Sequence, residues 1–235
     1  MIKYILLICM LTINLVAETQ FSLLKEDGIE LYYEKSLNPY TVEYALKLVK
    51  HSKNEFAKTF KFKITNTISF KIYLYADTIN FISDQKGMWW ESYIFKTNFV
   101  YINNVDFLME KNSFNLIIKY LITYRYLLVN FKEKIPAWFL KGVALYFANL
   151  TFPASDIKFT DFKELLDKLD NYATKEEFYQ ANRHLYNGID YLASNYTFDK
   201  IVKFIKNCNT TQDFEKLFFQ FFGLHINEFK EIILK

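Results

Sequence analysis

Two tyrosines and one lysine stand out as polar residues in two neighbouring apolar segments. Tyr120 and Tyr124 are four residues apart in a long apolar segment, and this spacing places both phenols on one face of a helix. Lys141 lies in a second apolar segment, which follows a short charged turn closed by Pro136. A phenol with a pKa near ~10 is a poor metal ligand at neutral pH, and an ammonium group repels a metal cation. The trio therefore suits packing and hydrogen bonding better than metal chemistry.

The other reactive residue types form no recognisable catalytic motif. The three histidines, His51, His184 and His225, are far apart, and none belongs to an H-x-x-x-H or H-x-H pattern. We expect each to be a satisfied surface or core residue, and His184 is the one that could line a cleft. The sequence has no G-x-S-x-G, P-loop or G-x-G-x-x-G motif. We therefore predict no catalytic residue, no bound metal and no cofactor.

Composition and charge indicate which classes of protein this chain can belong to. Of the 235 residues, 51% are hydrophobic and 20% aromatic, with only five Gly and three Pro, which indicates a well-filled folded core. The net charge of +3 is spread along the chain without a basic block, so nucleic acid is not an expected partner.

The N-terminus has the pattern of an export signal. Residues 1–17 combine Lys3 with an apolar run and end at Ala17, the expected cleavage position. An uncleaved N-terminal anchor is the alternative. We expect an exported protein, periplasmic or associated with the cell envelope, without a further membrane span. Cys208 would be the only cysteine left after cleavage, which excludes an intramolecular disulfide, and we expect it to be a small buried residue.

The N-terminal half alternates predicted strands and helices. A period of two predicts strands over residues 28–35, 67–75 and 99–104, and apolar residues at helical spacing predict a helix over 40–60. Asp77 is a candidate N-cap of a short helix that runs through Ile82.

The C-terminal half is predicted to be helical. Apolar helices are expected over 114–131 and 138–149, and further helices over 162–169, 175–196, 198–207, 211–222 and 227–234. Gly223 is a helix stop, and residues 149–158, with Pro153, form a candidate linker. The fold class is therefore α+β: a subdomain over 18–150 with a small mixed sheet and a helix pair, and a helical subdomain over 151–235 of the same unit.

The segment IPAWFLKGVALYFAN, residues 135–149, carries a specific resemblance to a known family. It resembles the P-x-W-x-x-E-G-x-A-x-Y-F helix of the peptidase MA-like group of gluzincins, the thermolysin-like zinc metallopeptidases. The residues in register are Pro136, Trp138, Gly142, Ala144, Tyr146 and Phe147. Softer matches over 72–87, 191–205 and 214–233 rest on apolar spacing and extend the similarity over nearly the whole mature chain. The resemblance implies a zincin-like domain.

The resemblance also implies that the chemistry of the family has been lost. The first zinc His of the family falls on Tyr120, the catalytic Glu on Leu121, the second His on Tyr124 and the zinc-binding Glu on Lys141. An ammonium group in a ligand position would repel Zn²⁺ by about 8 kcal/mol at about 4 Å and an effective dielectric of about 20. Leu121 cannot act as a general base. We therefore interpret the domain as a pseudo-peptidase.

Three functional hypotheses follow from this interpretation. The leading one is an exported, catalytically inactive gluzincin-like protein that acts as a binding or scaffolding module in the cell envelope. The second is a purely structural envelope protein whose cleft is filled. The third is a residual metal-dependent peptidase with rearranged ligands.

A peptide or protein is the partner that the leading hypothesis expects. In the family an extended peptide pairs with a strand beside the cleft, which implies pairing with the strand over 99–104 through main-chain bonds. The loop GMWWESYIF supplies aromatic contacts, although a hydrophobic flap packed on the core is an equal alternative. The candidate cleft residues are Trp89, Trp90, Tyr93, Val100, Tyr101 and His184.

Overall fold

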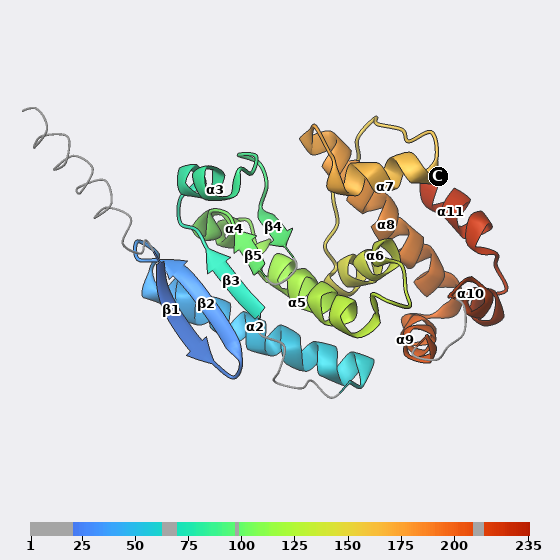
Figure 1. Cartoon of the computed structure of the whole chain (residues 1–235), viewed down its shortest axis with the longest axis horizontal. Coiled ribbons are helices and arrows are strands. Elements are labelled where there is room, and N and C mark those ends of the chain that lie inside the picture. The colour runs from blue at the N-terminus through green and yellow to red at the C-terminus, as the bar shows by residue number, and fades with distance from the viewer. Residues whose placement is uncertain (1–20, 63–69, 97–98, 209–213) are drawn as a thin grey trace, which may run out of the picture. The chain divides into compact units, whose positions relative to one another are not determined.

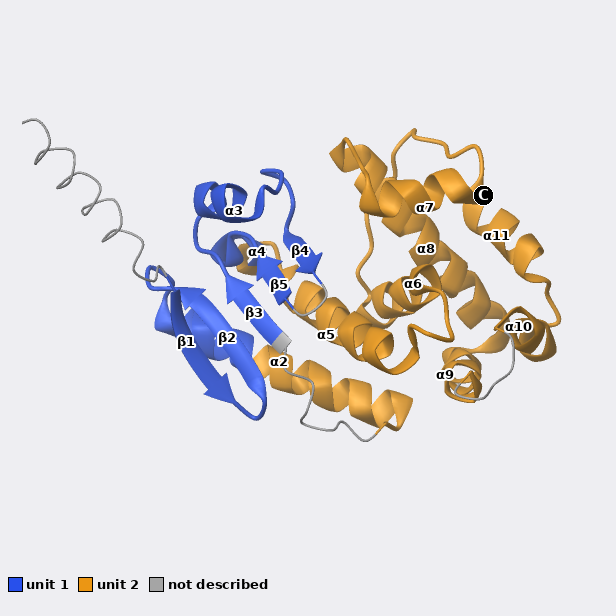
Figure 2. Cartoon of the chain, in the orientation of Figure 1, with its two compact units in different colours: residues 1–46, 65–108 blue, residues 47–64, 109–235 orange. Residues whose placement is uncertain are grey.

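The computed structural model describes residues 21–62, 70–96, 99–208 and 214–235 (Figure 1). The predicted signal peptide lies outside these ranges. The predicted α+β class is confirmed, because a small five-stranded mixed sheet precedes a mainly helical part. The chain forms two compact units: unit 1 comprises residues 1–46 and 65–108, and unit 2 comprises residues 47–64 and 109–235 (Figure 2). The predicted subdomains over 18–150 and 151–235 stay a prediction.

Unit 1 contains the whole sheet, with the strand order β1-β2-β3-β5-β4. The three central strands, β2 (Ile29–Glu34), β3 (Phe70–Leu74) and β5 (Phe99–Ile102), are parallel. The outer strands, β1 (Phe21–Glu26) and β4 (Tyr93–Lys96), are antiparallel to their neighbours. The predicted strands over 28–35 and 99–104 correspond to β2 and β5. The predicted strand over 67–75 corresponds to β3, although residues 67–69 lie outside the described ranges.

Neither outer strand is among the predicted elements. β1 and β2 are joined by Asp27 and Gly28, which both have positive φ angles, 51° and 77°. Asp-Gly is the preferred sequence of such a two-residue hairpin turn, so the signal is present in the chain. β4 lies inside the segment predicted to be a loop, and that prediction is wrong from Tyr93 onwards, because residues 93–96 pair with β5.

The two faces of the sheet differ in composition. Side chains alternate along each strand, so residues paired across β2, β3 and β5 share a face. One face carries the buried residues Leu31, Ile72 and Val100. The other carries half-buried Tyr32, Tyr73 and Tyr101, whose rings stack at 4.5 and 5.0 Å between centroids.

Three helices begin in unit 1. The first, α2 (Pro39–Phe60), starts in unit 1 and continues into unit 2 from Lys47, and it confirms the helix predicted over 40–60. The second, α3 (Thr78–Gln85), begins after Asp77, whose side chain accepts a hydrogen bond from the Ile79 N–H as an N-cap does. The third, α4 (Val105–Glu110), was not predicted.

Unit 2 continues with seven helices within the described residues. The predicted helix pair is present as α5 (Phe114–Phe131) and α6 (Ala137–Ala148). The later predictions correspond to α7 (Phe162–Asp170), α8 (Lys175–Tyr196), α9 (Phe198–Asn207), α10 (Phe214–Phe222) and α11 (Ile226–Leu234). Residues 211–213 of the helix predicted over 211–222 lie outside the described ranges. Gly223 has a φ of 63° after α10, as expected of a helix stop. Within the described ranges, no helix has the length and apolar character needed to cross a membrane.

α6 packs against both α5 and α8. A Cβ atom at Gly142 would lie 3.0 Å from the carbonyl oxygen of Leu185 on α8, so the close approach of the two helices favours glycine at this position. From α6, Phe139 makes edge-to-face contacts with Phe204 and Phe218 in the aromatic core. Cys208 is buried, as predicted.

Glu34 is a buried carboxylate that fixes the end of β2 in unit 1. It is 2% exposed, and its oxygens accept hydrogen bonds from the backbone N–H groups of Ala76 and Asp77 at 2.8 and 3.3 Å. They also accept from the Asn80 amide at 2.9 Å. A single side chain thus supplies acceptors to the turn after β3 and to the first turn of α3.

Glu34→Leu is expected to lower the free energy of unfolding by about 1–3 kcal/mol, because it removes the acceptor of three hydrogen bonds that tie β2 to the turn after β3 and to α3. Urea denaturation followed by circular dichroism measures the loss. Glu43→Leu, at an exposed position on α2, is the matched control and should change stability by less than about 0.5 kcal/mol. Equal losses in the two variants would contradict the assigned role of Glu34.

Candidate functional site

The helix pair α5–α6 carries the four positions that the sequence singles out. Tyr120 and Tyr124 share one face of α5, and their rings stack at 5.8 Å between centroids and 12° between planes. Leu121 is buried beside them, and Lys141 is half-buried on α6. The predicted sharing of one helix face by the two phenols is confirmed.

Asp170, the last residue of α7, acts electrostatically on this group. Burial lowers the pKa of Lys141 from 10.5 to about 8, and the negative charge of Asp170 opposes that shift. Burial raises the pKa of Tyr124 above its usual range, and Asp170 raises it further. At neutral pH the phenol is therefore neutral, and the amine is a protonated cation held in a poorly solvated place.

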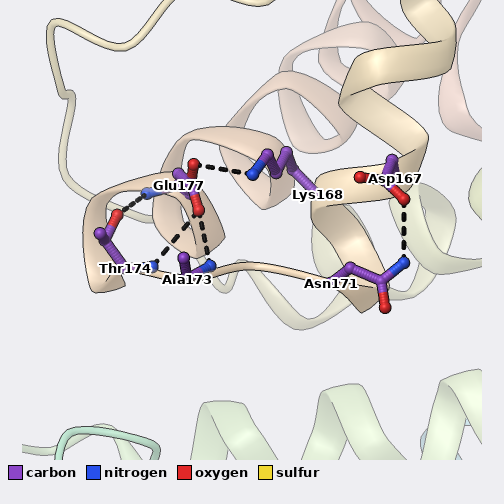
Figure 3. A network of polar contacts seen from close by, with 6 residues as sticks. All are labelled: Asp167, Lys168, Asn171, Ala173, Thr174 and Glu177. Atoms are coloured by element: carbon purple, nitrogen blue, oxygen red, sulfur yellow. Dashed lines mark hydrogen bonds and ion pairs between the residues drawn. The ribbon is translucent and has the colours of Figure 1, made fainter.

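A polar network at the α7–α8 connection holds the end of α7 in position (Figure 3). Glu177 on α8 accepts hydrogen bonds from the Ala173 and Thr174 N–H groups at 2.6 and 3.3 Å, and forms a 2.9 Å ion pair with Lys168 of α7. The Thr174 hydroxyl accepts from the Glu177 N–H, which completes a capping box. Because these contacts join α7 to the start of α8, they place the Asp170 carboxylate near the helix pair.

His184 is a buried side chain that joins two helices of unit 2. It is 8% exposed, and its Nδ1 donates to the carbonyl oxygen of Ile233 on α11 at 2.5 Å. Its Nε2 lies 3.0 Å from the Gln180 amide nitrogen, which makes Nε2 the acceptor. The Gln180 oxygen accepts in turn from Ser155. Burial lowers the pKa of His184, so the neutral ring is the form that fits these partners.

The other two histidines are also satisfied, as predicted. His51 is exposed, and its Nε2 lies 3.5 Å from a carboxylate oxygen of Glu55. His225 precedes α11, and its ring stacks on Phe219 at 4.4 Å between centroids. Across the described ranges, no group of three or more His, Cys, Asp or Glu side chains is placed to hold a metal ion.

The predicted cleft residues of unit 1 have different environments. Val100 is fully buried, so its side chain cannot contact a ligand, and its inclusion is wrong. β5 pairs with β3 on one side and β4 on the other. The prediction that a peptide pairs with the strand over 99–104 is therefore also wrong, because sequence periodicity does not reveal strand order. Tyr101 is half-buried and stacks on Tyr73.

The segment between α3 and β4 displays Trp89 at the surface of unit 1. Trp89 is 71% exposed and Met88 is 45% exposed, whereas Trp90 and Tyr93 are half-buried. The adjacent Glu91 is buried, and it accepts a hydrogen bond from the Met88 N–H. Because Trp89 is exposed, it is not part of a hydrophobic flap packed on the core, which was the alternative to a contact with a ligand.

Two further contacts fix this segment. The Asn103 amide donates to the Glu91 carbonyl oxygen at 2.9 Å, which links the turn to the residue that follows β5. At Gly87 an added Cβ would lie 2.8 Å from both Ile94 and Phe81, so the segment packs closely on its own unit. Trp89 is thus displayed by an ordered turn.

Comparison with known proteins identifies no family for this chain. No protein-family model matches the sequence, and no curated protein matches it. The gluzincin resemblance therefore stays a prediction that rests on the residues quoted above.

Lys141→Met is expected to raise the free energy of unfolding at pH 7 by about 1–3 kcal/mol, because it removes a desolvated charge while keeping the side-chain volume. The unfolded state binds this proton more tightly than the native state, so the native protein gains stability as pH rises from about 8 to 10.5. Urea denaturation across this range should show that gain in the wild type and less of it in the variant. Lys163→Met, at an exposed position on α7, is the control, and an identical response of both variants would contradict the assignment.

His184 is expected to make the protein less stable as pH falls from about 7 to 5. Its pKa is lowered on folding, so the unfolded state takes up the proton first, and stability is lost below the unfolded value of 6.5. His184→Gln should be less stable than wild type at pH 7.5, and the gap should narrow at pH 5.5. Exposed His51→Gln is the control for thermal melts at both pH values, and an unchanged gap for His184→Gln would contradict this role.

Proposed function

We propose that this protein is an exported, catalytically inactive gluzincin-like protein that binds peptide or protein partners in the cell envelope. The observation that carries the proposal is the occupation of the α5–α6 pair by two stacked phenols and a desolvated amine. In the resemblance, these are the positions of the metal ligands. The replacement is coherent, because the phenols pack on each other and the negative charge of Asp170 partly offsets the cost of burying the amine.

The chemistry at these positions opposes metal binding by charge as well as by ligand type. A divalent cation near the protonated Lys141 would be repelled, and the neutral phenols offer only weak donor oxygens. Leu121 is buried and apolar, so it cannot take a proton from water. The filled site equally suits a purely structural envelope protein, and a binding assay separates the two functions.

Binding is assigned to unit 1 because of the displayed Met88–Trp89 pair. Aromatic residues and Met are enriched in protein interfaces, where large rigid side chains bury much area at low entropic cost. An exposed Trp on an ordered turn therefore fits an anchor for an apolar segment of a partner. The half-buried Trp90 and Tyr93 extend the same segment into β4.

Trp89→Ala is expected to weaken the binding of peptides selected from a random peptide display library by at least tenfold, with little change in melting temperature. Fluorescence anisotropy with labelled peptides measures the affinity. Ile79→Ala is the matched control, because Ile79 is an equally exposed apolar residue of unit 1 on α3. Failure to select any peptide, or equal weakening in both variants, would favour the purely structural function.

The metal state of the protein is expected to have no effect on its stability. Elemental analysis of protein purified without chelator should find no stoichiometric zinc, and added zinc or chelator should leave the melting temperature unchanged. The same preparation should not cleave unstructured protein substrates. Stoichiometric zinc with a chelator-sensitive melt would contradict the proposal and favour a residual peptidase.

A further inference from the structure

A basic groove lies between two helices of unit 2, on residues that the proposed function does not use. It has a volume of about 750 Å³ and is lined by the part of α2 from His51 onwards, by Lys61 and by α9. On each helix the lining residues recur at three- and four-residue spacing, so each contributes one face. A volume of this size is typical of sites for small molecules.

The groove carries more positive than negative charge. Its four lysines, two from each wall, are Lys58, Lys61, Lys203 and Lys206. Its carboxylates are Glu55 and Asp199. Glu55 is already engaged, since its oxygen lies 3.2 Å from Lys119 Nζ and 3.5 Å from His51 Nε2.

The lysines are available for a ligand. Among the ion pairs of the described residues, none involves Lys58, Lys61 or Lys203, and all three are exposed. Lys206 is half-buried, and its Nζ lies 5.9 Å from the centre of the Phe62 ring. Like charges gathered in this way repel each other, and a multiply charged anion would relieve that repulsion.

The two walls are held together by aromatic packing beneath the groove. Phe60, at the end of α2, is fully buried and lies edge-to-face on Phe198 of α9 and on Phe147 of α6. Phe56, one turn earlier, stacks on Tyr126 of α5. Because these contacts fix both helices, the separation of the lysine pairs is set before any ligand binds.

We propose that this groove binds a small molecule that carries two neighbouring phosphate groups, such as a diphosphate ester. Lysine is a common phosphate ligand, which it binds as a point charge, and the four lysines of the groove together match the several negative charges of a diphosphate. Lys203 and Lys206 are three residues apart on α9, about 4.5 Å along the helix axis, which suits adjacent phosphates, and Lys58 with Lys61 lies on the opposite wall. Asn54 and Thr59 add neutral hydrogen-bonding groups to the α2 wall.

Isothermal titration with inorganic pyrophosphate tests the groove directly in the intact protein. The wild type should bind, and Lys58→Gln with Lys203→Gln should weaken binding at least tenfold. The control pair is Lys163→Gln with Lys216→Gln, which makes the same change of charge at exposed positions outside the groove and should alter affinity less than twofold. Thermal melts establish that both double variants fold.

A second arm separates a soluble ligand from a lipid headgroup. Sedimentation with vesicles of phosphatidylcholine, with and without phosphatidic acid, shows whether the groove recognises phosphate on a membrane surface. Pyrophosphate binding without sedimentation supports a soluble diphosphate compound, and groove-dependent sedimentation that pyrophosphate competes away supports a headgroup. No binding in either arm, or equal weakening in both double variants, would overturn the proposal.

Discussion

Close packing of α6 against α5 and α8 is the constraint on which the rest of unit 2 depends. The helix buries seven of its residues, and a Cβ atom added at Gly142 would lie only 3.0 Å from the Leu185 carbonyl oxygen of α8. Such packing leaves little water around a polar group on this helix. Lys141 therefore has a lowered pKa, and the Asp170 carboxylate becomes a main source of electrostatic compensation.

The close packing of α6 also explains the arrangement of the two phenols on α5. Two aromatic rings at i, i+4 on α5 fill space by stacking on one another, and burial keeps Tyr124 neutral. A metal site would need several charged or imidazole ligands in this place, with further polar groups to orient them. Packing by aromatic rings requires neither metal ligands nor polar groups to orient them. The α5–α6 pair can thus serve as a structural core, while the features suited to binding lie on separate surfaces: the Trp89 turn in unit 1 and the lysine groove in unit 2.

The helices were the most predictable part of the fold. Helical periodicity located every helix from α5 to α11, and Asp77 and Gly223 were correctly assigned as helix-end residues. β1 and β4 were missed because short outer strands with half-exposed side chains show weak alternation. The Asp-Gly turn was the one signal that could have located β1.

At the candidate site, only contacts between residues that are close in sequence could be predicted. The stack of Tyr120 on Tyr124 follows from spacing along one helix. Partners that are distant in sequence cannot be derived this way: His184 bonds to Ile233, 49 residues away, and Asp170 reaches Lys141 from another helix. Strand order was likewise hidden, which led to the wrong assignments for Val100 and for pairing at β5. The groove could not be predicted either. The spacing of its lysines is visible in the sequence, but only the fold shows that its two walls face each other.

Under the proposed function, the metal-ligand positions of a gluzincin-type scaffold fall on residues 120, 124 and 141 of α5 and α6. The zinc affinity of a ligand-restored variant, Tyr120→His with Tyr124→His and Lys141→Glu, tests this placement. Leu121 is left unchanged because it is buried and is not a ligand position. This variant should bind one zinc ion at least tenfold more tightly than Tyr120→His with Tyr124→His alone, and zinc should raise its melting temperature. A folded triple variant that binds no zinc would contradict it.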